Sequence, residues 1–209
     1  MIPEADFEAA GSKVVGTAAE AVGDADVILE VRRPNAEELK SFMTGALVLA
    51  IMDPYGREAE LKAMADAGVS AFAMELMPRI TRAQVMDVLS SQANLAGYRA
   101  VVDAAAEFGK ALPMMMTAAG TVPAAKAFLM GVGVAGLQAI ATARRLGAVV
   151  TATDVRPATK EQVESLGAKL VAVEDDEFKQ AETAGGYAKA LSDAYKAKHA
   201  ALVTAHIVT

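Results

Sequence analysis

Short apolar runs alternate along the chain with stretches of helical periodicity. In the first half, aliphatic runs predict strands over 27–31, 46–52 and 69–74. Spaced apolar positions predict helices over 58–67 and 81–109, with an interruption near Gly97. Because helices separate the apolar runs, we interpret this half as βαβ units that form a parallel sheet.

The second half repeats the alternation after a break. Pro113, Gly120 and Pro123 indicate a looped or hairpin segment. Beyond it, the predicted strands are 126–130, 149–153 and 170–173. The predicted helices are 134–146, 160–166 and a last helix that reaches Tyr195. We therefore expect an α/β fold with Rossmann-like parallel sheets in two domains, the first over 1–122 and the second over 123–209.

Composition excludes several classes of function. The 209 residues carry 20 Lys and Arg against 26 Asp and Glu, a formal net charge of −6, which argues against a nucleic-acid partner. The chain has no cysteine, so a disulfide scaffold, a cysteine-ligated metal and thiol catalysis are excluded. Only His199 and His206 are present, close to the C-terminus. We therefore expect neither a metal site nor a Ser-His-Asp triad.

Neither a secretory signal nor a membrane span is expected. The first residues carry Glu4 and Asp6 where a signal peptide would carry Lys or Arg. The longest uncharged run lies between Lys126 and Arg144, at the lower limit for a membrane span, but three glycines interrupt it. We interpret this run as a buried strand that enters a helix, in a soluble chain without direct membrane insertion.

The strongest chemical signal is the turn Gly131-Val132-Gly133-Val134-Ala135-Gly136, a G-x-G-x-x-G between a predicted strand and a predicted helix. The first glycine allows a tight turn, the second lets a pyrophosphate approach the backbone, and the third lets the helix pack against the strand. Free N–H groups at the helix start then face the anion. Glycine-rich turns are common, so the motif by itself is weak.

Asp154 strengthens this interpretation. It follows the next predicted strand, at the distance of about 20 residues where a carboxylate accepts hydrogen bonds from the adenosine ribose and repels a 2′-phosphate. Arg156 complicates the choice, because an arginine here can accept that phosphate. We favour NAD(H) over NADP(H), since Asp154 lies at the strand end. The plainer alternative is an ordinary strand-turn-helix with a capping aspartate.

Five longer stretches carry a further signal: 73–84 (AMELMPRITRAQ), 90–100 (SSQANLAGYRA), 117–123 (TAAGTVP), 133–143 (GVAGLQAIATA) and 184–189 (AGGYAK). These stretches resemble the NAD(H)-binding component of proton-translocating NAD(P) transhydrogenase. Together they span most of residues 70–200 and are more specific than the glycine motif. Alanine dehydrogenase shares the fold and several of these features.

The resemblance implies a dimer of two-domain α/β subunits with NAD(H) in the cleft. It implies hydride transfer to NADP⁺ on a separate component, while a membrane component couples the reaction to proton movement. The chain would then be cytoplasmic and peripheral to the bacterial inner membrane through its partner subunits. Residues 123–209 would be the first half of the NAD-binding domain.

The resemblance also assigns site residues. Those that position the nicotinamide are Arg79, Gln84, Asp87 and Ser90. Further cofactor contacts fall to Gly131, Gly133, Val134, Ala135, Gly136, Asp154, Val155 and Arg156. A mobile loop that closes over the nucleotide corresponds to Gly185, Gly186 and Tyr187. A hairpin that crosses the dimer interface corresponds to Met114–Met116. Without the family, these segments would be a capped helix start, a surface turn and core packing.

Departures from the family leave two alternatives open. The chain begins after the family's opening strands and stops before its last ones, so a fragment with exposed edges and apolar faces is expected. It could be a non-catalytic fragment of the fold. An alanine dehydrogenase-type enzyme is the other alternative, but that chemistry uses a His and a Lys in the first domain, and 47–54 (LVLAIMDP) contains no histidine.

Overall fold

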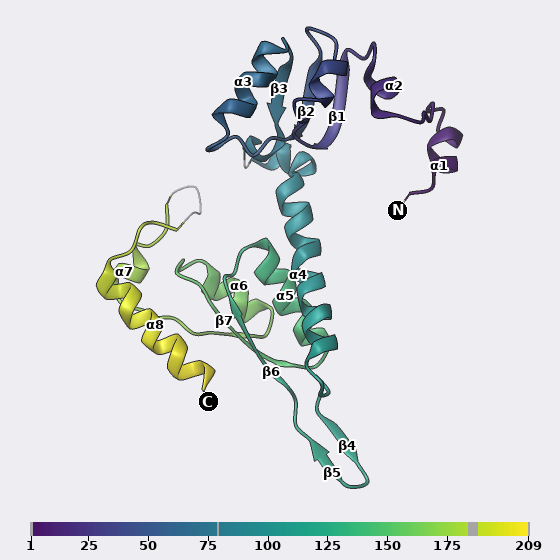
Figure 1. The fold of residues 1–209 in the computed structure, drawn as a ribbon. Helices are drawn as coiled ribbons and strands as arrows, with labels where there is room; N and C mark the ends of the chain where they lie inside the picture. The colour runs from purple at the N-terminus through teal and green to yellow at the C-terminus, as the bar shows by residue number, and fades with distance from the viewer. Residues whose placement is uncertain (1, 79, 184–187, 209) are drawn as a thin grey trace. The chain divides into compact units, whose positions relative to one another are not determined.

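A computed structural model describes residues 2–78, 80–183 and 188–208. They divide into two units, 1–89 and 90–209, each considered by itself below (Figure 1). Both units are built on parallel sheets with connecting helices, which confirms the expected α/β class. The expected division into a first domain over 1–122 and a second over 123–209 stays a prediction.

The first unit contains a three-stranded parallel sheet in the order β1-β2-β3. Its strands are β1 (Val27–Arg32), β2 (Leu47–Ile51) and β3 (Ser70–Ala73). Its α-helices are α1 (Glu4–Ala9), α2 (Ala18–Val22) and α3 (Glu58–Asp66), and a 3₁₀ turn, η1, covers Glu38–Ser41. The predicted strands and the helix over 58–67 are confirmed; α1 and α2 were not predicted.

One face of the first sheet is covered and the other is not. Ile28 and Val48 are buried, together with Met64 of α3. Side chains alternate between the faces of a strand, so the neighbours of these residues point the opposite way. Leu29 and Phe72, which belong to one cross-strand row, are exposed. The described residues of the first unit therefore leave one apolar sheet face open.

The expected interruption near Gly97 is wrong. Two 3₁₀ turns, η2 (Met74–Leu76) and η3 (Thr81–Met86), precede a continuous helix, α4 (Val88–Glu107), which passes through Gly97. Gly97 is needed for packing, because a Cβ added there would lie 2.0 Å from the carbonyl oxygen of Ala135. The helical pattern is broken at Asp87, between η3 and α4.

The second unit contains a hairpin and a second parallel sheet. The hairpin strands are β4 (Met115–Thr117) and β5 (Gly120–Val122), and the sheet strands are β6 (Lys126–Met130), β7 (Val149–Thr153) and β8 (Lys169–Leu170). The helices are α5 (Val134–Arg145), α6 (Thr159–Ser165), α7 (Asp176–Lys179) and α8 (Asp193–Ile207). The order β6-β7-β8, with parallel pairing, corresponds to the first half of a doubly wound sheet.

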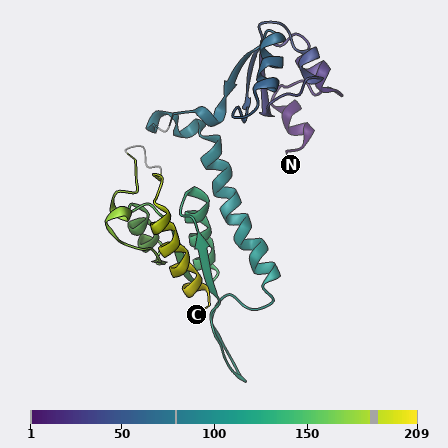
Figure 2. The same cartoon turned by 60° about the vertical axis from the view of Figure 1, so that its left-hand side comes forward.

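Two boundaries in this unit differ from the expectation. β8 ends at Leu170, since only Thr151 and Ala152 of β7 pair with it. The last helix does not end at Tyr195 but begins just before it, because the Ser192 hydroxyl accepts the N–H of Tyr195 at 3.1 Å and caps the first turn. The predicted hairpin is confirmed (Figure 2). The side chains of Met114–Met116 are exposed rather than part of a core.

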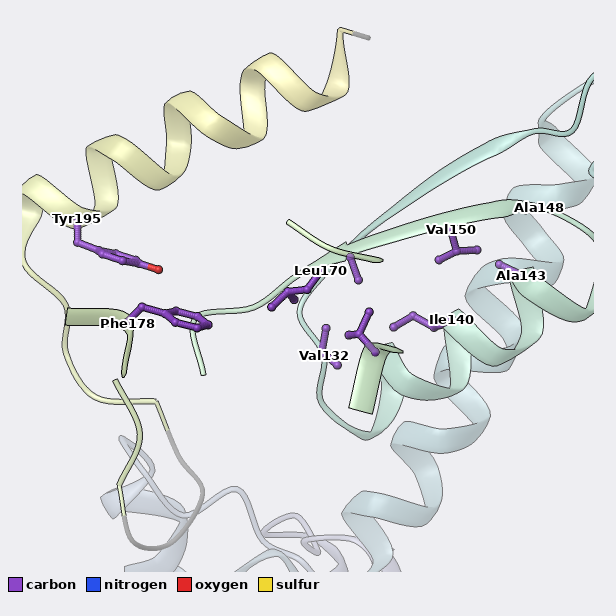
Figure 3. Packing of buried hydrophobic residues seen from close by; sticks show 10 residues of the cluster. Val132, Ile140, Ala143, Ala148, Val150, Leu170, Phe178 and Tyr195 are labelled. Atoms are coloured by element: carbon purple, nitrogen blue, oxygen red, sulfur yellow. The ribbon is translucent and has the colours of Figure 1, made fainter. Parts of the chain in front are cut away.

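Strand β7 separates two layers of the second unit. Val150 packs with Ile140 of α5 and with Val132 and Leu170 in the hydrophobic core (Figure 3). The side chains of Thr151 and Thr153 point to the opposite face. There each hydroxyl lies 2.8 Å from a histidine Nε2 of α8, Thr151 from His206 and Thr153 from His199. Both histidines therefore attach α8 to the sheet.

Candidate functional site

The glycine-rich turn joins the end of β6 to the start of α5. Gly131 has a φ of +96°, a conformation that side-chain-bearing residues rarely adopt, and its N–H donates to the Thr153 carbonyl at 2.8 Å. A Cβ on Gly136 would lie only 1.9 Å from the Gly131 carbonyl oxygen. The first glycine is therefore required by the turn, and the third by the contact between helix and strand, as the motif predicts.

The described residues leave the outer side of the turn open. None of their atoms lies within 4 Å of the position that a Cβ on Gly133 would occupy. The N–H groups of Val134, Ala135 and Gly136 have no acceptor among the described residues, while the next one, on Leu137, donates to the Gly133 carbonyl. Three N–H groups and the positive end of the α5 dipole thus face a space that an anionic group can enter.

Asp154 lies beside this turn, directly after β7. One carboxylate oxygen, Oδ2, accepts the Val132 N–H at 2.8 Å, and the other, Oδ1, accepts the Arg156 N–H at 2.9 Å. The Arg156 guanidinium donates through Nε to Oδ1 and through Nη2 to Oδ2, both at 3.0 Å. Nη2 also donates to the Val132 carbonyl at 2.9 Å. The carboxylate therefore ties the glycine-rich turn to the end of β7.

Opposing effects set the charge of Asp154. Burial raises the pKa of its carboxyl group, whose side chain is only 9% exposed. Hydrogen bonds from the Arg156 side chain and from the N–H groups of Val132 and Arg156 outweigh burial, together with the attraction of the guanidinium, and hold the pKa below its usual value. Asp154 is thus ionised at neutral pH.

The structure brings one part of the predicted site together. The residues that meet at the carboxyl ends of β6 and β7 are Gly131, Gly133, Val134, Ala135, Gly136, Asp154, Val155 and Arg156. Val155 also lines a cavity of about 300 Å³ beside α8, with His199 and Tyr195. In open α/β sheets, ligands bind at this edge.

The residues predicted to position a nicotinamide are distributed over both units. Gln84 and Asp87 of the first unit line one pocket of about 260 Å³, which η3 and the segment before it form. Ser90 belongs to the second unit, in the first turn of α4. Arg79 lies outside the described residues, as do Gly185, Gly186 and Tyr187 of the predicted mobile loop. The roles of all seven stay predictions.

Two contributors to the site were missed from the sequence. Val132 holds Asp154 through its backbone N–H, and nothing in its side chain signals this. Gly97 lets α4 approach the first turn of α5, beside the N–H groups that face the open side. A glycine inside a helical pattern can mark such a close approach, so a signal for Gly97 was present.

Neither a metal centre nor a membrane span is formed by the residues described. No group of three or more acidic or histidine side chains gathers where it could hold a metal ion within residues 2–78, 80–183 and 188–208. Among the helices described, none is both long enough and apolar enough to cross a membrane.

Comparison with known proteins finds two family models that together match most of the chain. A family model described as "Alanine dehydrogenase/PNT, N-terminal domain" matches residues 1–96, and one described as "Alanine dehydrogenase/PNT, C-terminal domain" matches 100–208. An NAD(P) transhydrogenase subunit alpha chain of Rhodospirillum rubrum is 54% identical over 205 residues, which are 96% of this chain and 53% of the relative. An alanine dehydrogenase of Mycobacterium tuberculosis is 30% identical over 157 residues, 74% of this chain and 42% of the relative.

Solved structures agree with these matches. The transhydrogenase structure from Sinorhizobium meliloti superposes with a TM-score of 0.85 at 66% identity and covers 99% of this chain and 54% of that one. An L-alanine dehydrogenase structure superposes with a TM-score of 0.67 at 21% identity, covers 80% of this chain and 47% of that one, and shows the shared fold alone. The chain spans about half the length of the Rhodospirillum rubrum relative. It belongs to the alanine dehydrogenase/PNT family.

Proposed function

We propose that this chain is the NAD(H)-binding part of a proton-translocating NAD(P) transhydrogenase, and that it takes part in hydride transfer between NADH and NADP⁺ held on a partner component. The observation that carries the proposal is the ionised Asp154 beside the open glycine-rich turn. The names of the relatives at 54% identity support the transhydrogenase over other enzymes of the fold.

The residues present fit a dinucleotide. The N–H groups of Val134, Ala135 and Gly136 would hold the pyrophosphate at the start of α5, where Gly133 leaves room for it. The Asp154 carboxylate would accept hydrogen bonds from the adenosine ribose. Bound NADH supplies the hydride. The chain's own contribution is placement and exclusion of water, and it needs no protein acid or base at the reacting carbon.

The polar residues of η3 and the segment before it are proposed to position the nicotinamide. Gln84 offers a donor and an acceptor to an amide or a ribose, and Asp87 lines the same pocket. Arg79 and Ser90 complete the proposed set. These residues would fix the orientation of the nicotinamide ring so that it meets the second ring at near-attack distance.

A titration of the 209-residue chain with NADH and, separately, with NADPH tests the cofactor. Saturable binding that favours NADH is expected, because the ionised Asp154 repels a 2′-phosphate. Saturable binding that favours NADPH would contradict the choice of NAD(H). Binding of neither would mean that the proposal does not hold for this chain by itself.

Gly133→Ala separates cofactor binding from folding. Alanine tolerates the observed φ of −85° and ψ of −166°, and its Cβ would meet no atom of residues 2–78, 80–183 and 188–208 within 4 Å. The free energy of unfolding should therefore change by less than about 1 kcal/mol. The affinity for NADH should fall roughly tenfold or more, because the methyl group occupies the approach of the pyrophosphate. Urea unfolding and NADH fluorescence measure the two quantities, and an unchanged Kd would contradict the placement.

Asp154→Asn tests the ribose contact. The neutral amide keeps the shape but loses the charged acceptor, so NADH affinity should fall by roughly ten- to a hundredfold, at about 1.5–3 kcal/mol for a hydrogen bond to a charged group. The preference for NADH over NADPH should decrease, because the variant no longer repels the 2′-phosphate of NADPH and Arg156 no longer pairs with a carboxylate. Asp103→Asn, on exposed α4, makes the same change of charge as a control. Unchanged NADH/NADPH selectivity would remove Asp154 from the adenosine site.

Alanine dehydrogenase activity is the second candidate, since a relative at 30% identity carries that name. An assay with NAD⁺ and alanine separates the two. Release of ammonia would contradict the transhydrogenase proposal. The absence of histidine from residues 47–54 favours a negative result.

We further propose partners and a location. NADP(H)-binding and membrane components would receive the hydride and couple it to protons, so the chain would lie at the cytoplasmic side of the bacterial inner membrane. The exposed β4–β5 hairpin, with Met114–Met116, would contact a second copy in a homodimer. Size-exclusion chromatography with light scattering should show a discrete dimer; a polydisperse sample would instead support a non-catalytic fragment.

A further inference from the structure

The hydrogen-bonding positions of the Asp154 carboxylate are filled by the protein itself. An ionised carboxylate offers about four lone-pair positions. The backbone N–H groups of Val132 and Arg156 take one on each oxygen, at 2.8 and 2.9 Å. The Arg156 guanidinium takes the other two through Nε and Nη2, both at 3.0 Å. In this arrangement no position remains for a ligand.

The two kinds of donor differ in how readily they can leave. The Val132 N–H belongs to the glycine-rich turn and the Arg156 N–H to the backbone that follows β7, so neither can move without changing the fold. The guanidinium stands on a flexible side chain that is 23% exposed. Its two parallel bonds have the geometry of a bidentate pair, which is also the geometry in which a ribose 2′,3′-diol donates to one carboxylate.

We propose that Arg156 is a latch on the ribose subsite, and that its guanidinium must be exchanged for the two ribose hydroxyl groups when a nucleotide binds. This inference rests on the proposed binding of NAD(H). The latch keeps the buried carboxylate satisfied before the ligand arrives, which avoids an unpaired buried charge. It also lowers affinity for every ligand with a ribose diol, because the two charge-assisted bonds to Asp154 and the bond from Nη2 to the Val132 carbonyl must first be broken. Arg156 is thereby a determinant of ribose affinity.

The test compares two ligands of equal phosphate charge, AMP and 2′-deoxy-AMP, as competitors of NADH fluorescence. Their ratio of Kd values isolates the contribution of the 2′-hydroxyl and cancels the loss of a positive charge near the phosphate. In Arg156→Leu, preference for AMP over 2′-deoxy-AMP should rise about three- to tenfold above that of the wild type. Arg145→Gln, an exposed position on α5, removes the same charge elsewhere and should leave the ratio unchanged.

A second variant keeps the test informative if Arg156→Leu does not fold. Arg156→Lys keeps the charge but lacks the planar fork, so the preference for AMP should rise here also. An unchanged or smaller ratio in both variants, with NADH still bound by the wild type, would overturn the latch and leave the proposed function standing. Saturable NADH binding by neither wild type nor variants would contradict the proposed function and the latch together.

Discussion

Gly136→Ala should destabilise the second unit by about 3 kcal/mol or more and remove detectable NADH binding. By intrinsic propensity alone, alanine would stabilise a helix by about 1 kcal/mol relative to glycine. Here its Cβ would lie 1.9 Å from the Gly131 carbonyl oxygen, a backbone atom that cannot turn aside as the end of a flexible side chain could. Relief requires α5 to move away from β6, which opens the core at Ile140 and Val132.

Urea unfolding of wild type, Gly136→Ala and Gly133→Ala measures this effect. Gly133→Ala is the matched control, because it adds the same methyl group three residues earlier, where the part of the chain that the structure describes has no atom within 4 Å. We expect a lower midpoint for Gly136→Ala alone, and weakened NADH binding in both variants. An unfolding midpoint of Gly136→Ala equal to that of the wild type would contradict the account of the third glycine.

The part of the site that could be predicted from the sequence is the glycine-rich turn, because its backbone conformation requires glycine at particular positions. Gly131 has a positive φ, and Gly136 packs directly against the Gly131 carbonyl oxygen. Both conditions favour glycine, so each is visible in the sequence as a glycine of the motif. Asp154 could be placed because the stretch that precedes it, 149–153 (VVTAT), is rich in β-branched residues and predicts a strand that ends there. The link between Asp154 and Arg156 could not be decided, since an arginine at this position can pair with the carboxylate or await a phosphate.

Contacts between segments far apart in the chain could not be predicted from the hydrophobic pattern. His199 and His206 were considered only as possible ligands or catalytic groups, whereas they bond threonines that lie 46 and 55 residues earlier in the chain. The short β8 has a similar cause, because its length depends on how much of β7 it meets. The start of the last helix was misplaced because Ser192, whose hydroxyl accepts the Tyr195 N–H, was not recognised as its N-cap.

Gly97 shows most clearly how a tertiary contact reverses a local preference. As an isolated position, a glycine in a helical pattern favours an interruption. In the structure it lies inside α4 because a side chain there would strike the first turn of α5. The same contact makes Gly97 relevant to function, since Ala135 supplies one of the N–H groups that face the open side of the turn.

Gly97→Ala should therefore lower both stability and NADH affinity. Its Cβ would lie 2.0 Å from the Ala135 carbonyl oxygen, so α4 must shift away from α5, at a cost of about 2–4 kcal/mol after the gain in helix propensity. The shift should also displace the N–H groups at the start of α5, with a roughly tenfold or greater loss of NADH affinity. Thermal unfolding and NADH titration measure the two effects. Asn94→Ala, at an exposed position of the same helix, is the control and should unfold at or slightly above the wild-type temperature. A Gly97→Ala chain that matches this control in both measurements would show that α4 and α5 do not need their close contact.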